Sequence, residues 1–540
     1  MWSEKLHDFL KPRRHLLLEP DEVYVEPFIK PLLDRPNSAF THSTISGAHP
    51  RSYWATYSKI FNGKLLPKRE PLKEGDPRLR ETDFSLLVTG SLHRWYKDGM
   101  QIQSHVNYAN MVLSQMALAS QTNELFHTLG LVRMLFWLPR QSQTIVAPRT
   151  LTQKSALSMT IEVATKLDVI VSPDAESDAP LLAKWELRDS KSRTPRHERV
   201  MADRVLARMD RARISLPDHR RTPQHQAAID RKKTGQLEPR ADGWSPDMEM
   251  PLTLGQIKDE VKSLTTDVNN FVAIAVNRFR TTLDNPNNGV AELAAIKYNF
   301  ADSLLGNKSP GETIRSGFYM DYLGRQLRLE REFTIHASEF PSAEQETIKR
   351  DILAIGDTLR ETFDTINLHL RTRLRMFAEE DRGLLQDPPS LQYDRRQFEP
   401  LMCKEDEFWP NYPMCLVDLT PRKENLASDI TAAHEATYAM RDMAKELWTR
   451  ARDPVPQSLE RMAPMAGHDL IRDTPIITDP LRGGRMNAND MSSRALTSEM
   501  FRQLVVSYLE WPFRPTNAQL AASATFSEPA ETRTALEDIE

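Results

Sequence analysis

The sequence has little cysteine and no long apolar run. Its 540 residues include only Cys403 and Cys415. Two cysteines are too few for a disulfide framework or a cysteine-based zinc site, and they favour a reducing compartment. No stretch of about 18 consecutive apolar residues occurs, so we expect no membrane span. We therefore expect neither a membrane nor a metal ion among the partners of this chain.

The bulk composition is typical of globular proteins. Hydrophobic residues make up 40% of the chain and charged residues 27%, and the length is sufficient for two or three domains. The formal net charge is -4, but the charge is unevenly distributed. Residues 181–240 contain 16 Lys and Arg against 8 Asp and Glu. This pattern indicates a basic segment, suited to non-specific phosphate contacts, on a mildly acidic body.

A short apolar run near residue 87 indicates a buried strand. The segment 83–96, DFSLLVTGSLHRWY, passes from this run through Thr-Gly-Ser into a basic and aromatic patch. A run of this kind, bounded by turn residues, is typical of a strand in a parallel sheet. In open α/β sheets the functional residues follow the carboxyl ends of the strands. We therefore expect functional residues at 91–96.

Helices and strands alternate in the first 171 residues, which predicts an α/β fold. Residues 2–10 have a helical apolar face, and strands are expected at 15–18, 131–138 and 167–171. A doubly wound sheet normally has a first strand and a Gly-rich turn before its first helix. Neither is found here, and no targeting peptide is recognisable, so the chain looks truncated at its N-terminus.

The rest of the chain divides by composition. Arg- and Pro-rich residues from 172 to about 250 predict an insertion that is partly disordered or weakly helical, and apolar residues at helical spacing follow at 254–275 and 348–377. Strands at 397–402 and 414–419 are expected to form a hairpin that closes one edge of the sheet. The predicted organisation is an α/β domain at 1–171, a basic and helical insertion at 172–390, the closing hairpin at 391–421, a helical domain at 422–515 and a disordered acidic tail at 516–540.

Two acidic residues have positions suited to a nucleotide-like cofactor. Glu19 follows the strand at 15–18, where a carboxylate can accept hydrogen bonds from a ribose diol. Asp76 precedes the strand at 83–91, where it can contact an adenine amino group. Each residue also has a simpler explanation: Glu19 as a solvated residue at a strand end, and Asp76 as the cap of an Asp-Pro turn.

Aromatic and basic residues alternate in two places, 51–54 and 94–97. Aromatic rings stack on the bases of single-stranded nucleic acid while basic groups bind its phosphates. The segment 45–61 is explained more simply as a helix with an aromatic core face. The candidate nucleic-acid-binding residues are Arg51, Tyr53, Trp54, Arg94, Trp95, Tyr96 and Lys97.

Several motifs in order resemble the rRNA adenine N6-dimethylase family, and within it the fungal mitochondrial transcription factor B branch. The matching segments are HLLLEPD (15–21), EGDPRLR (74–80), LLVTGSL (86–92), FWPNYPMCLVDLTP (408–421), SLERMAPMAG (458–467) and RALTSEMFRQL (494–504). The resemblance covers about 1–171 and 391–515. It implies a Rossmann-like sheet that binds S-adenosyl-L-methionine, here without its first strand and Gly-rich loop, and a small C-terminal helical domain.

The resemblance also assigns roles to individual residues. Glu19 takes the place of the acid that binds the cofactor ribose, Asp76 that of the acid near the adenine, and Ser91 that of the Asn in the family's Asn-Leu-Pro-Tyr motif. That motif reads Ser91-Leu92-His93-Arg94 here. An enzyme that methylates an adenine must extrude the base and hold it against an aromatic face. A serine and a His-Arg pair do not supply those contacts, so we expect methyl transfer to be weak or absent.

Three functions are consistent with these observations. The first is a mitochondrial transcription initiation factor that binds promoter DNA and assists the mitochondrial RNA polymerase in melting it. The second is an S-adenosylmethionine-dependent enzyme that methylates adenines in mitochondrial small-subunit rRNA. The third is a structural protein of ribosome assembly. We expect the first, in the mitochondrial matrix, because it needs a nucleic-acid surface and no catalytic residues.

Overall fold

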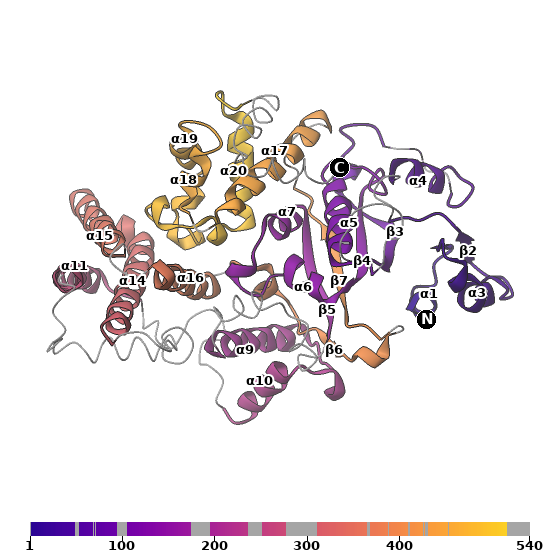
Figure 1. Ribbon diagram of the computed structural model, residues 1–540, viewed down its shortest axis with the longest axis horizontal. Helices are drawn as coiled ribbons and strands as arrows, with labels where there is room; N and C mark the ends of the chain where they lie inside the picture. Colours follow the sequence, from indigo (N-terminus) through magenta and orange to yellow (C-terminus); the bar gives the residue numbers. More distant parts are fainter. Residues whose placement is uncertain are drawn as a thin grey trace, which may run out of the picture.

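The computed structural model describes residues 2–48, 53–67, 70, 72–93, 105–173, 195–235, 251–276, 310–363, 368–386, 388–408, 411–424, 426, 430–451 and 453–515. In Figure 1 a sheet flanked by helices occupies one side of the molecule, the C-terminal helices lie above it, and the inserted helices lie beside and below it. The architecture is mixed α/β, and it is compatible with a Rossmann-like fold.

The main sheet has five strands in the order β3-β4-β7-β5-β6. Their bounds are β3 Thr82–Ser91, β4 Leu131–Pro139, β5 Thr165–Pro173, β6 Leu401–Cys403 and β7 Met414–Pro421. β3 is parallel to β4 and β5 is parallel to β6, whereas β7 is antiparallel to both β4 and β5. The sheet is therefore mixed.

The expected closing hairpin does not form. β7 lies in the middle of the sheet, and β6 pairs with β5 instead of β7. All residues of β7 except Thr420 are buried, and a strand that is covered on both faces is favoured at the centre of a sheet. The Pro-aromatic loop at 404–413 therefore connects β6 to β7 across the end of β5 instead of closing a hairpin.

A second sheet stands apart from the first. It consists of β1 (His15–Leu18) and β2 (Phe40–Ser43), which are parallel. The helix α1 (Trp2–Leu10) precedes β1, and α2 (Glu22–Tyr24), a π-helical turn at Val25–Ile29 and α3 (Lys30–Leu33) connect β1 to β2. The helix and strand expected at 2–18 are thus confirmed, but β1 does not pair with the main sheet.

The C-terminal helices share one hydrophobic core with the main sheet. The flanking helices are α4 (Tyr53–Ile60), α5 (His105–Ala119), α6 (Arg140–Val146) and α7 (Ala156–Ala164), and the C-terminal helices are α17 (Ile430–Thr449), α18 (Val455–Glu460), α19 (Ala466–Arg472) and α20 (Ser498–Glu510). Buried side chains of α7, α17 and α20 belong to the same cluster as those of β4 and β7. The C-terminal region is therefore packed directly onto the α/β part.

The described part of the insertion is helical, and residues 174–194 and 236–250 of the stretch expected to be partly disordered lie outside the described residues. Its described helices are α9 (Pro195–Ala212), α10 (Pro223–Lys233), α11 (Leu254–Val276), α14 (Pro310–His336), α15 (Ser342–Phe363) and α16 (Leu368–Leu385). In α9, Val205 and Met209 are buried together with Leu216 against the partly buried Phe398 and Leu401. A few well-spaced apolar residues are thus sufficient to dock an Arg-rich helix beside β6. The stripe expected at 348–377 is divided between α15 and α16.

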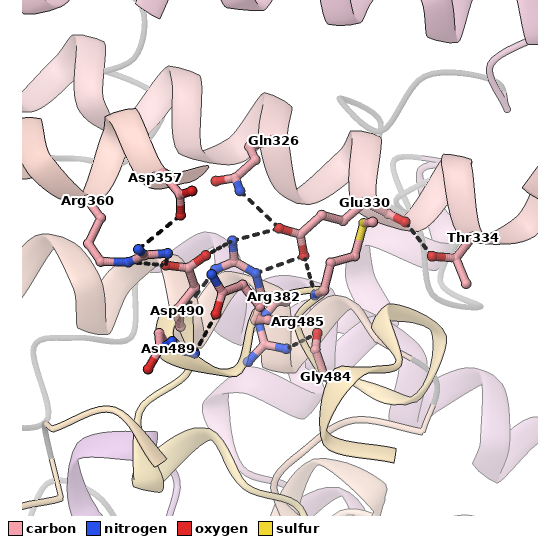
Figure 2. Close-up of polar contacts among 12 residues, drawn as sticks. Gln326, Glu330, Thr334, Asp357, Arg360, Arg382, Gly484, Arg485, Asn489 and Asp490 are labelled. Atoms are coloured by element: carbon pink, nitrogen blue, oxygen red, sulfur yellow. Dashed lines mark hydrogen bonds and ion pairs between the residues drawn. The ribbon is translucent and has the colours of Figure 1, made fainter. Parts of the chain in front are cut away.

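A network of charges, with the buried pair of Arg485 and Glu330 at its centre, joins the insertion to the C-terminal region (Figure 2). Arg485 donates from Nε to one oxygen of Glu330 and from an Nη to the other, both at 2.9 Å. Gln326 and the backbone N–H of Met486 also donate to this carboxylate. Arg360 on α15 donates to Asp490 at 2.8 Å. These contacts fix α14 and α15 to the segment before α20.

The described residues contain neither a candidate membrane span nor a candidate metal site, and both cysteines are free. No helix among them is long and apolar enough to cross a bilayer, and no three His, Cys, Asp or Glu residues of these segments are arranged to hold a metal ion. Cys403 and Cys415 are buried and are not disulfide-bonded. Burial raises the pKa of the Cys415 thiol to about 12, so the thiol is protonated and unreactive at neutral pH.

Candidate functional site

A cavity of 480 Å³ lies between the two sheets. It is lined by β1 with the flanking Arg14 and Glu19, by residues 85–91 of β3, and by apolar side chains of α1 and α4. Its volume falls in the range of small-molecule sites in proteins. The cavity brings together two residues that the sequence singled out, Glu19 and Ser91.

Glu19 is held at the carboxyl end of β1 by its backbone. Its N–H donates to the carbonyl of Ser43 at 3.1 Å, and its own carbonyl contacts Nε2 of His42 at 2.9 Å. The carboxylate accepts the backbone N–H of Asp21 at 3.0 Å. The side chain therefore borders the cavity with accepting capacity left for a further donor.

Ser91 ends β3, and the residues after it turn towards the loop before β7. Ser91 is exposed and its Oγ accepts the backbone N–H of His93 at 3.4 Å, whereas Leu92 is buried. The imidazole of His93 packs on the ring of Tyr412, with 4.3 Å between the ring centroids. Tyr412 in turn contacts the amide oxygen of Gln141 at 3.2 Å. Arg94 lies outside the described residues.

The distance between His93 and Tyr412 limits what this site can hold. A base held between two rings needs two van der Waals separations, about 7 Å in total. At 4.3 Å the two rings are in direct contact. No base can therefore lie between these two rings.

Aromatic side chains gather beside this pair. The ring of Trp137, near the end of β4, contacts the rings of Trp2 and Phe408 edge-to-face. The ring centroids are 5.5 Å apart for Trp2 and 5.3 Å apart for Phe408. The indole N–H of Trp2 donates to Oγ1 of Thr89 at 3.3 Å. Trp2 is exposed, and Trp137 and Phe408 are half-buried. We call Trp2, Trp137, Phe408 and Tyr412 the aromatic edge.

The other predicted site residues lie elsewhere. Asp76 caps the 3₁₀ turn at Pro77–Arg80, which precedes β3, so it stands at the opposite end of this strand from Ser91. Its carboxylate pairs with Arg78 at 2.6 Å, and the hydrogen bonds from Arg78 lower the pKa of Asp76. The structure therefore favours the turn-cap explanation for Asp76 and does not bring it to Glu19 and Ser91.

The candidate nucleic-acid residues divide into two groups. Tyr53 is buried in the hydrophobic core, and burial raises the pKa of its phenol well above its usual value. It cannot stack on a bound base, so this assignment is corrected: the aromatic face of α4 is a core face. Trp54 lies on α4. Arg51, Trp95, Tyr96 and Lys97 lie outside the described residues.

Sequence reasoning missed the aromatic edge. The rule that directed attention to the end of β3 applies equally to Trp137 at the end of β4, and the loop before β7 has conspicuous aromatic residues at 408 and 412. Trp2 carried no such signal, because it lies on the apolar face expected to pack as helix core.

The site fits S-adenosyl-L-methionine only in part. Glu19 suits a ribose diol, and the cavity volume suits a small ligand. Among the described residues no strand lies between β1 and β3, so the part of the site that the structure describes is the ribose-facing side. No protein-family model, curated protein or solved structure matches this chain.

Proposed function

We propose that this chain is a nucleic-acid-binding protein on a methyltransferase-like sheet, and that it acts as a mitochondrial transcription initiation factor. The observation that supports the proposal is the contact between His93 and Tyr412, because these two rings pack on each other and leave no room for a base between them. The mitochondrial RNA polymerase, promoter DNA and the matrix location enter the proposal through the sequence resemblance.

The aromatic edge supplies the binding surface in this proposal. Stacking on exposed or half-buried rings holds single-stranded nucleic acid without base-specific contacts. Trp2 and Phe408 flank Trp137 at the carboxyl end of β4, next to the end of β3, after which the basic and aromatic residues 94–97 follow in the sequence. A melted promoter strand would lie along this edge of the sheet.

Binding of a labelled single-stranded oligonucleotide tests the proposal. We expect Trp2→Ala and Phe408→Ala each to weaken binding about tenfold, since stacking contributes about 1–3 kcal/mol per base. Phe84→Ala is the matched control: Phe84 is 94% exposed on the same strand as Ser91 but near its other end, and its loss should leave binding unchanged. Equal effects at all three positions would contradict the proposal.

The alternative is an S-adenosylmethionine-dependent rRNA adenine N6-methyltransferase. The position of Glu19 on the cavity favours it, because a carboxylate at this strand end suits a ribose. Calorimetry with S-adenosyl-L-methionine decides between the two. Tight binding that is lost in Glu19→Ala would support the enzyme, and no measurable binding would support the initiation factor.

A further inference from the structure

The run of chain that leads into the aromatic edge is held by the insertion. Residues 394–407 follow the insertion, form β6 and lead into the loop that carries Phe408 and Tyr412. In Figure 1, α9 of the insertion lies alongside β6. Buried apolar side chains of α9 pack against residues 398 and 401 of this run. The insertion is therefore in contact with the segment just ahead of the aromatic loop.

Polar side chains of α9 bind the backbone of the same run. Arg208 donates from one Nη to the carbonyls of Asp394 and Arg396, both at 2.8 Å. The Sδ of Met209 accepts the backbone N–H of Glu399 at 3.4 Å. Side chains that satisfy backbone groups in this way fix the course of the chain. α9 therefore holds the part of the run that precedes β6.

Arg220 holds the other end of the run. It ends the 3₁₀ turn between α9 and α10, and one Nη donates to the carbonyl of Met402 at 3.1 Å and to both carboxylate oxygens of Glu407 at 2.7 Å. The same carboxylate accepts the backbone N–H of Lys404 at 3.2 Å. Burial alone would raise the pKa of the Glu407 carboxyl, but the hydrogen bonds from Arg220 and Lys404 lower it. Glu407 is therefore charged at neutral pH and ties the insertion to residues 404–407.

Phe408 follows Glu407 directly. The backbone N–H of Glu407 donates to the carbonyl of Lys404 at 3.2 Å, so the turn that ends at Glu407 is closed through its backbone and through its side chain. Phe408 leaves this turn and packs edge-to-face on Trp137. The position of the Phe408 ring thus depends on the turn, and the position of the turn depends on Arg220.

We propose that the insertion positions the aromatic edge, and that Arg220 is the positioning residue that sets Phe408 against Trp137 through Glu407. The role of the α9–α10 unit is then to hold the loop that binds nucleic acid. The Arg220–Glu407 pair is partly exposed, at 31% and 37% of the two side chains, so its contribution is smaller than that of a buried pair. This inference rests on the proposed binding of single-stranded nucleic acid by the aromatic edge.

Binding of the labelled single-stranded oligonucleotide to the full chain tests the proposal. We expect Arg220→Ala to weaken binding about threefold, less than Phe408→Ala. Because Arg220 acts through Phe408, the double variant should bind no more weakly than Phe408→Ala alone. Arg220→Lys, which keeps the cation, should recover part of the loss. Additive losses in the double variant would show that Arg220 contacts the nucleic acid itself, and they would overturn the proposal.

Lys232→Ala is the matched control. Lys232, on α10, pairs with Asp210 of α9 at 2.7 Å, and the two side chains are 49% and 46% exposed. Its replacement removes one positive charge from the same unit and leaves the bonds to residues 394–407 in place, so binding should be unchanged. Equal weakening by Lys232→Ala and Arg220→Ala would show that this basic unit contacts phosphates directly, and the positioning role would be wrong.

A spectroscopic measurement on the free protein separates this proposal from the nucleic-acid site. With 4-fluorophenylalanine incorporated only at position 408, the fluorine resonance reports the contact of this ring with Trp137. We expect Arg220→Ala to shift the resonance and Lys232→Ala to leave it in place. An unchanged resonance in Arg220→Ala would overturn the positioning role. If Phe408→Ala binds the oligonucleotide as well as the unaltered chain does, the proposed nucleic-acid site is wrong, and the resonance alone decides whether the insertion positions Phe408.

Discussion

Polar groups are paired differently in two regions of the molecule. These regions are the cavity between β1 and β3 and the junction between α14 and the C-terminal region. At the cavity, residues 14–19 around β1 and residues 85–91 of β3 line an open space of 480 Å³. At the junction, the side chains of Arg485 and Glu330 are only 6% and 2% exposed, and they pair with each other through two hydrogen bonds. The first region leaves an open volume beside its polar groups, whereas the charges of the second are paired with each other.

The comparison shows where this fold has a fixed geometry. Burial of a charge is tolerated only when its partner is held in place. Burial alone would lower the pKa of Arg485, but Glu330 outweighs this effect and holds it above its usual value, so the guanidinium remains charged. The junction is therefore a rigid attachment of the insertion, and conformational change on binding is expected at the cavity.

Breaking the junction should have the largest effect. Arg485→Met leaves the Glu330 carboxylate buried without its cation, and we expect the free energy of unfolding to fall by about 3–5 kcal/mol. Urea denaturation measures this change. The paired variant Arg485→Met with Glu330→Met should recover most of the loss, because it removes both charges. A loss below about 1 kcal/mol in the single variant would show that the junction is not a closed network.

Two glycines provide a matched test of packing in the two regions. A Cβ on Gly484, beside the junction, would lie 2.3 Å from the carbonyl oxygen of Ile477, so Gly484→Ala should destabilise the protein by about 1–3 kcal/mol. A Cβ on Gly90, in β3, would meet nothing closer than Phe136 at 3.9 Å. Gly90→Ala should be nearly neutral in thermal unfolding. Similar losses of stability in both variants would contradict the expected difference in packing between the junction and the cavity.

Acid should destabilise the α/β part, with a contribution from one fully buried histidine. His127 is fully buried, burial lowers its pKa from 6.5 to about 3, and its Nδ1 accepts the N–H of Val132 at 3.0 Å. Because the unfolded chain binds a proton there more readily, stability falls as the pH drops below about 6.5. We expect a loss of about 1 kcal/mol between pH 6 and pH 5. His127→Asn, which keeps an acceptor, should lose less stability over this interval in parallel denaturation curves. An unchanged pH dependence would show that His127 does not control it.

The sequence predicted individual elements well where their patterns were regular. The strands at 15–18, 83–91 and 131–138 and the helix at 254–275 correspond to β1, β3, β4 and α11. The prediction that the strand near residue 87 is buried was wrong, because β3 lies at the edge of the sheet and none of its residues is fully buried. It predicted less well where few residues carried the packing, as in α9, whose docking depends on Val205 and Met209. It identified Glu19 and Ser91 as site residues, and these two do line one cavity. Asp76, predicted to lie near the cofactor adenine, lies at the opposite end of β3 from Ser91. Tyr53, predicted to bind nucleic acid, is buried in the core.

The sequence by itself determined which segments form strands and helices and which of their faces are apolar, because those properties depend on neighbours a few residues away. Only the tertiary structure decided that β7 lies at the centre of the sheet, that His93 contacts Tyr412, and that β1 and β3 leave a cavity between them. These features depend on which edges and rings meet across long stretches of chain. Periodicity shows that a strand has a buried face, but it does not show which strand, if any, lies beside it.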